Sequence, residues 1–240
     1  MKYAIITGGS RGIGRAIAES LASAGYHLFL VARDSERLSV AARELEQEYR
    51  VTVVTFPCDL ADKTSGDAIA TAIRKYEIVP DVLVLNAGVY LEGDLDPPRL
   101  SDAPFSIFEE TLKVNCFSVL RCVQALIDDL RKGAGKRIVI IGSTASHEAY
   151  HFGPSYGVSK WATRGLAINL REELKPLGIG VTLINPGGTL TDLWAGEELP
   201  PKRLLEPSDI GKVVKMCLEL SEQAVVEEVI IRPMLGDMHN

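Results

Sequence analysis

The chain has few of the residues that build metal centres, disulfide scaffolds or membrane spans. Its 240 residues include only four cysteines and four histidines, all widely separated, with neither metal-ligand spacing nor a paired disulfide rhythm. No segment approaches the roughly 18 unbroken apolar residues of a membrane span. A net charge of -6 argues against broad nucleic-acid binding. We therefore expect buried free thiols, no metal site, and neither a nucleic-acid nor a membrane partner.

The overall composition is that of an ordinary soluble globular protein. Hydrophobic residues make up 46% and charged residues 24% of the sequence, which is typical of globular proteins. The opening "MKYAIITGG" enters an apolar run within three residues, leaving no room for the apolar core of a signal peptide. We expect a cytoplasmic protein, and the length fits one domain spanning residues 1–240.

Apolar runs alternate with helical patterns along almost the whole chain. Helical periodicity predicts helices at 15–25, 35–49, 65–76 and 104–132. Continuous apolar runs predict strands at 3–7, 27–32, 51–56, 82–86, 137–143, 180–185 and 228–232. Such strands, separated by helical crossovers, indicate an α/β fold with a doubly wound parallel sheet of the Rossmann type, about seven strands wide and covered by helices on both faces.

Two irregular stretches interrupt this pattern, at 90–104 and at 192–209. Loops of that length are unusual in a compact domain and are often functional. We interpret about 190–209 as a loop that covers the substrate, with a plain connector as the alternative. Trp194 within it either covers the substrate or packs the loop against the body.

The first predicted strand leads directly into "TGGSRGIG" at 7–14 and then a helix. Gly8, Gly12 and Gly14 let the backbone turn sharply and approach a ligand closely. The following helix start offers free amides and a positive dipole end to a phosphate. Strand before and helix after are the context that makes this turn a predicted dinucleotide-binding site.

The second predicted strand bears on the choice between NADP and NAD. Ala32 stands where an NAD site would place an acid, and Arg33 follows it. With Arg11, two guanidiniums could bracket a 2'-phosphate, which favours NADP(H) over NAD(H). Asp34 leaves two interpretations open, because it could bind a ribose or cap the helix that follows.

The stretch "YGVSK" places Tyr156 four positions before Lys160. One helical turn puts both on the same face, so a cation lies beside a phenol. We expect this neighbour to lower the pKa of the tyrosine toward the working pH of a general acid.

Seven segments in order carry a family resemblance: "TGGSRGIG", "CDL" at 58–60, "LNAG" at 85–88, "KVNCF" at 113–117, "IIGS" at 140–143, "YGVSK" and "NPGGTLT" at 185–191. Together they resemble the short-chain dehydrogenase/reductase family, in its compact single-domain branch, over essentially the whole chain. One departure is Leu85, where the family commonly has a first asparagine.

The resemblance implies roles for particular residues. The implied catalytic set is Ser143, Tyr156, Lys160 and Asn115, with Asn115 anchoring a water that connects Lys160 to solvent. The implied cofactor-binding set is Gly8, Ser10, Arg11, Gly12, Ile13, Gly14, Arg33, Asp59, Leu60, Asn86, Ala87, Gly88, Tyr156, Lys160, Pro186, Gly187, Thr189 and Thr191. Within it, Asp59 contacts the adenine, Asn86 and its neighbours line the adenosine, and the two threonines close on the carboxamide and phosphate.

The chemistry of ketone reduction agrees with these roles. Negative charge develops on the carbonyl oxygen, so donors must be waiting there. Ser143 can hold that oxygen while Tyr156 gives the proton. The sequence therefore predicts an NADP(H)-dependent, metal-free carbonyl reductase acting reversibly on ketones and secondary alcohols. The alternatives are a dinucleotide sensor without catalysis and a sugar-nucleotide epimerase. The region after residue 190 is short for the latter.

The sequence leaves the substrate open. The tail "VVEEVIIRPMLGD" at 225–237 resembles bacterial sepiapterin-reductase-like members, whereas "SRGIGRAIA" is similar to many 3-oxoacyl-carrier-protein reductases. His147 and His151 are expected to shape the substrate pocket or face water. The resemblance also implies a homodimer or homotetramer, for which the apolar 104–132 segment is a candidate interface.

Overall fold

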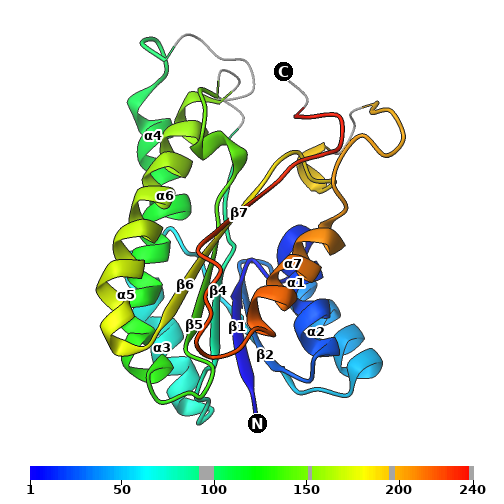
Figure 1. Ribbon diagram of the computed structural model, residues 1–240, viewed down its shortest axis with the longest axis vertical. Coiled ribbons are helices and arrows are strands. Elements are labelled where there is room, and N and C mark those ends of the chain that lie inside the picture. The colour runs from blue at the N-terminus through cyan, green and yellow to red at the C-terminus, as the bar shows by residue number, and fades with distance from the viewer. Residues whose placement is uncertain (92–99, 151–152, 195–197, 238–240) are drawn as a thin grey trace.

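The computed structural model shows one seven-stranded sheet in which every neighbouring pair of strands is parallel. It describes residues 1–91, 100–150, 153–194 and 198–237. The strands are β1 (Tyr3–Thr7), β2 (His27–Ala32), β3 (Val53–Pro57), β4 (Val82–Leu85), β5 (Arg137–Ile141), β6 (Gly180–Pro186) and β7 (Glu228–Ile231), in the spatial order β3-β2-β1-β4-β5-β6-β7. The predicted doubly wound α/β fold is confirmed (Figure 1).

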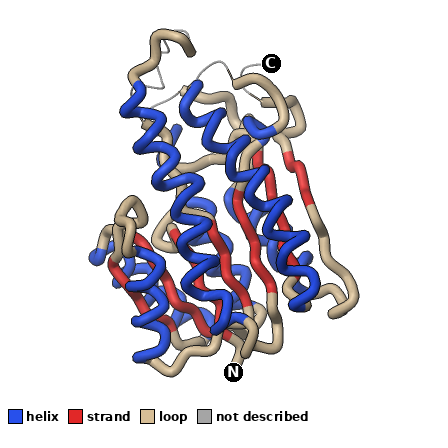
Figure 2. Tube along the Cα trace, turned by 90° about the vertical axis from the view of Figure 1, so that its left-hand side faces the viewer, coloured by secondary structure: helices blue, strands red, loops and turns tan. Residues whose placement is uncertain are grey.

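Helices cover both faces of this sheet. They are α1 (Gly12–Ser23), α2 (Ser35–Tyr49), α3 (Ser65–Lys75), α4 (Phe105–Leu112), α5 (Ser118–Leu130), α6 (Pro154–Leu174) and α7 (Pro207–Leu218). Helices α1, α2 and α7 pack their apolar residues on one face, and α3, α5 and α6 on the other. Figure 2 looks onto the helices at the left of Figure 1, with the strands running side by side behind them. Both faces of the central strands are therefore buried, which explains why these strands are continuously apolar.

The predicted helix at 104–132 is divided into three parts. Between α4 and α5 lies a π-helical turn, Lys113–Phe117, in which the backbone hydrogen bonds skip one extra residue. Apolar periodicity alone does not reveal such a turn. It matters because Asn115 lies at its centre.

The direction of the strands decides where a site can form. The chain crosses from β3 past β2 and β1 to β4, so the strand order reverses between β1 and β4. In open parallel sheets, ligands bind beyond the carboxyl ends of the strands at such a reversal. The glycine turn after β1 and the polar residues after β4, β5 and β6 all lie at this edge.

No helix in the described part of the chain combines the length and the apolar character needed to cross a bilayer.

Candidate active site

The glycine turn has the shape that the sequence predicts. Gly8 and Gly12 have left-handed φ angles of 68° and 54°, which glycine adopts without strain. A Cβ on Gly14 would lie only 2.1 Å from the Gly8 carbonyl oxygen. Arg11 occupies the N-cap of α1 and makes no side-chain capping hydrogen bond there, so the first-turn amides of α1 face the crevice uncapped. This geometry suits an anionic ligand.

Asn86 fastens this turn to the neighbouring strand. Its side-chain nitrogen donates to the Thr7 carbonyl at 2.9 Å, and its backbone amide donates to Thr7 Oγ1 at 3.0 Å. The Ala87 amide also donates to Thr7 Oγ1. Asn86 therefore holds the ends of β1 and β4 together beside the predicted adenosine site, whatever it contacts in a complex.

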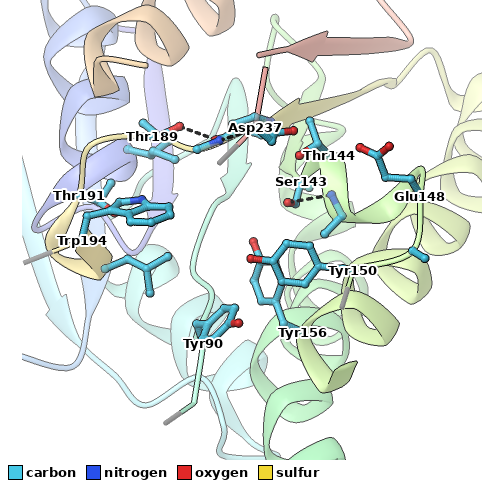
Figure 3. A pocket seen from close by; sticks show the side chains of 18 residues that line it. Tyr90, Ser143, Thr144, Glu148, Tyr150, Tyr156, Thr189, Thr191, Trp194 and Asp237 are labelled. Atoms are coloured by element: carbon cyan, nitrogen blue, oxygen red, sulfur yellow. Dashed lines mark hydrogen bonds between the residues drawn. The ribbon is translucent and has the colours of Figure 1, made fainter. Parts of the chain in front are cut away.

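Ser143 and Tyr156 come together from different elements. Ser143 follows β5 and caps a short 3-10 turn, accepting a hydrogen bond from the Ala145 amide. Tyr156 lies in the first turn of α6, and its phenol shares a hydrogen bond with the Ser143 hydroxyl. Both side chains line a cavity of about 180 Å³ (Figure 3).

Lys160 lies one turn further along α6, on the same side as Tyr156. Its Nζ is 5.5 Å from the centroid of the Tyr156 ring and donates to the Ile141 carbonyl at 3.1 Å. The residue is only 5% exposed. Burial disfavours the charged ammonium and lowers the pKa of Lys160 from 10.5 to about 8.

The expected lowering of the tyrosine pKa is wrong for the chain alone. Burial raises the pKa of Tyr156 from 10.0 to about 12, and the Ser143 hydrogen bond only partly opposes this. The sequence revealed the charge of the neighbour but not the burial of the phenol, which has the larger effect here. Without a ligand, Tyr156 therefore keeps its proton over the physiological pH range.

Asn115 supports Tyr156 and Lys160 through hydrogen bonds to α6, the helix that carries them. Its side chain accepts from the Val89 amide at 2.8 Å and donates to the Val89 carbonyl at 3.0 Å and to Ser159 Oγ at 2.9 Å. Ser159 in turn donates to the Tyr156 carbonyl. The backbone carbonyl of Asn115 accepts a hydrogen bond from the Thr163 hydroxyl. The π-helical turn thus connects the chain after β4 to α6. The water that the resemblance places at Asn115 stays a prediction.

Other predicted residues fall into three groups. Ile13, Pro186, Gly187, Thr189 and Thr191 line the same cavity as Ser143 and Tyr156. Asp59 and Arg33 are exposed at the ends of β3 and β2, away from that cavity, whereas Leu60 is buried in the core. Because the Leu60 side chain packs inside, only its backbone could contact a cofactor. Ser10, Gly88 and Ala87 lie in the turns after β1 and β4.

Two of the arginines at this end of the sheet share a carboxylate partner that the sequence did not predict. Arg11 forms an ion pair with Asp192, and Arg37 reaches the same carboxylate at 3.4 Å. Asp34 caps α2 by accepting from the Arg37 amide at 3.0 Å, which is one of its two predicted roles. Sequence reasoning missed Arg37, although it lies only four residues after Arg33. Asp192 is 181 residues from Arg11, and no sequence signal connects them.

A second polar group lies behind Ser143. Asn185, fully buried, accepts from the Ser143 amide at 3.2 Å and donates to Glu228 at 2.9 Å. Glu228 also pairs with Arg164 at 2.9 Å, and His147 lies 3.1 Å away. These interactions, with Arg164 the largest, hold the pKa of the Glu228 carboxyl below its usual range. Asn185 could have been found from sequence because it is the last residue of the predicted strand 180–185, just as Ser143 is the last residue of the predicted strand 137–143.

His147 contacts Glu228 and does not line the cavity, and its side chain is 17% exposed, so the first of its two predicted roles is wrong. His151 lies outside the described residues. Trp194 does line the cavity. The base of its loop is held by backbone hydrogen bonds that join residues 188 and 190 to Leu205. Within the described ranges, no group of three or more candidate ligands could hold a metal ion.

The short chain dehydrogenase family matches residues 2–200 of this chain. A sepiapterin reductase from Chlorobaculum tepidum is 30% identical over 98% of both chains. An alcohol dehydrogenase from the archaeon Thermococcus sibiricus, solved with 5-hydroxy-NADP, covers 100% of both chains at 32% identity and a TM-score of 0.89. L-sorbose reductase from Gluconobacter frateurii, solved with NADPH and L-sorbose, covers 100% of this chain and 97% of its own at 28% identity and a TM-score of 0.87.

Proposed function

Because this chain belongs to the short chain dehydrogenase family and is an NAD(P)-dependent oxidoreductase, we propose that it is an NADP(H)-dependent carbonyl reductase. Its reaction would be the reversible conversion of a ketone to a secondary alcohol without a metal. The observation that carries this proposal is the meeting of Ser143 and Tyr156 in one cavity that also includes Ile13 of the glycine turn and residues of the 186–191 segment.

The residues at the crevice fit a dinucleotide. The uncapped start of α1 and the left-handed Gly8 and Gly12 would receive the pyrophosphate. Thr189 and Thr191 lie at the cavity beside Ile13, where they would hold the nicotinamide end. When bound, the nicotinamide supplies or accepts the hydride.

Preference for NADP rests on charge. Arg33 directly follows β2, and Arg11 and Arg37 both reach Asp192, so these three arginines would supply the positive charge that the 2'-phosphate of NADP needs. Asp34 is occupied as a helix cap, so it competes poorly for a ribose hydroxyl. Two of the similar structures carry NADP-type cofactors, which supports the same choice.

The chain's own groups would act as follows. Ser143 would hold the substrate oxygen, since its hydroxyl lies beside the Tyr156 phenol. Tyr156 keeps its proton because of burial, so it would donate that proton to the oxygen as negative charge develops there. Lys160 would position the cofactor ribose and, once charged, oppose the rise in the pKa of Tyr156. Asn115 would hold α6 in place.

The test compares wild type with Tyr156→Phe. The phenylalanine variant should lose at least 100-fold in kcat for ketone reduction, the usual worth of a general acid, while its Kd for NADPH changes little. Binding can be measured by equilibrium dialysis and turnover by NADPH oxidation. Equal turnover in both proteins would exclude Tyr156 as the acid. Cofactor binding without turnover on any ketone would favour the alternative, a dinucleotide sensor.

A homodimer or homotetramer is part of the proposal. Val158, Trp161 and Ile168 on α6 and Phe117 beside it are large apolar side chains that remain 41% to 47% exposed. Exposed apolar groups gathered on neighbouring elements indicate an interaction surface. Light scattering would measure the mass of the assembly. A cytoplasmic location and a single domain with a substrate loop at about 190–209 stay predictions.

A further inference from the structure

The charged side chains that line the cavity beside Tyr156 are carboxylates. Eighteen residues of the described chain line it, and Glu148 and Asp237 are its only ionisable acids or bases apart from tyrosine. No lysine, arginine or histidine is among those eighteen. Figure 3 shows both carboxylates on the same side of the cavity as Ser143.

Two guanidiniums lie behind this wall and bind its acidic residues. Arg232 forms ion pairs with Glu148, at 2.8 Å, and with Asp237. Arg203 donates to the carbonyls of Gly236 and Asp237 at 2.7 and 3.0 Å. Because neither arginine lines the cavity, their charges stabilise the acidic wall but present no donor to a ligand. Among the described residues that line the cavity, an anionic substrate would meet carboxylate oxygens and no cation.

The remaining walls are aromatic. Tyr90, Tyr150 and Tyr156 lie together, with the centroids of the Tyr90 and Tyr156 rings 5.1 Å apart and those of Tyr150 and Tyr156 5.6 Å apart. Trp194 lies across the cavity from Tyr150 and Tyr156 (Figure 3). Facing aromatic walls accommodate a planar or apolar body.

From this wall we infer that the substrate is an uncharged carbonyl compound that carries hydrogen-bond donors, such as hydroxyl or amide groups, on a compact ring or chain. The inference rests on the proposed function and narrows it. Glu148 is the specificity-determining residue, since its carboxylate is partly exposed at the wall and accepts donors. Oxo acids are disfavoured by the same carboxylate.

A matched set of aryl ketones tests this inference: 2-oxo-2-phenylacetamide, its methyl ester analogue and the free acid. The amide is neutral with donors, the ester neutral without them, and the acid anionic. Binding is followed by quenching of Trp194 fluorescence in Trp161→Phe protein loaded with NADP⁺, because Trp161 is the one other tryptophan of the chain. Rates of reduction with NADPH are measured in parallel.

The expected order of affinity is amide, then ester, then acid, with the acid at least fivefold weaker than the amide. Glu148→Gln should shrink the gap between amide and acid at least twofold. An acid that binds as tightly as the amide, an ester that binds more tightly than the amide, a gap unchanged in Glu148→Gln, or no saturable quenching by any compound would overturn the inference. A chain that fails to bind NADPH in dialysis would instead overturn the proposed function.

Discussion

The buried ammonium of Lys160 makes a prediction about stability that does not depend on activity. Burial lowers the pKa of Lys160 from 10.5 to about 8 in the folded chain. Since one pKa step is about 1.4 kcal/mol, keeping this group charged below pH 8 makes the folded chain about 3 kcal/mol less stable. Lys160→Met removes that charge with little change in volume. The variant should therefore be more stable than wild type at pH 7, although it loses the hydrogen bond to Ile141.

The sign follows from proton binding. Between pH 8 and 10.5 the unfolded chain holds the lysine proton and the folded chain has lost it, so the stability of wild type rises with pH in that window. The stability of Lys160→Met does not rise with pH in this way, because methionine does not titrate. The difference between the two proteins should therefore narrow by about 2 kcal/mol between pH 7 and pH 9.5. The other titratable groups are present in both proteins, so their contributions to the pH dependence of stability cancel in this comparison.

Urea unfolding of cofactor-free protein, followed by circular dichroism at both pH values, measures the difference. Lys212→Met is the control, because Lys212 is 71% exposed and should show no pH-dependent difference from wild type. A stability difference for Lys160→Met that stays the same from pH 7 to pH 9.5 would show that the folded lysine titrates normally and would refute the reasoning.

Four further changes test other parts of the structure. Gly14→Ala should lose about 2 kcal/mol and cofactor binding, because its Cβ would meet the Gly8 carbonyl. Gly165→Ala, with open space around it on α6, should gain up to about 1 kcal/mol in the same urea unfolding experiment. Glu228→Ala should lose about 2 kcal/mol by leaving Arg164 without its partner. Asp192→Asn should tighten binding of 2',5'-ADP two- to fivefold, and unchanged affinity would contradict competition for the arginines.

The sequence predicted the fold well because local pattern and tertiary packing agree. All seven predicted strands are present, and α2 has the predicted bounds of Ser35–Tyr49. Apolar runs buried on both faces give a strong signal in such a sheet. The π-helical turn at Lys113–Phe117 was not predictable, because it changes the hydrogen-bond register without changing the apolar pattern.

The candidate site was predictable where its side chains lie at the ends of strands or one helical turn apart. Ser143 and Tyr156 do meet at one cavity, and Lys160 lies on the same side of α6 as Tyr156. Long-range electrostatics were not predictable. The pairing of Asp192 with Arg11 joins residues far apart in sequence, and the raised pKa of Tyr156 depends on burial that composition does not reveal.

The π-helical turn around Asn115 restricts how the chain can change in length. A π-helical turn holds one residue more than the α-helical turn it replaces, so deleting one residue here would permit ordinary helical bonding from α4 through α5 with the two helices still in phase. The turn that places Asn115 would be lost, and with it the Asn115 hydrogen bonds to Val89 and Ser159. A regular α-helix over these five residues would not place Asn115 at the site, and the chain has a π-helical turn there instead.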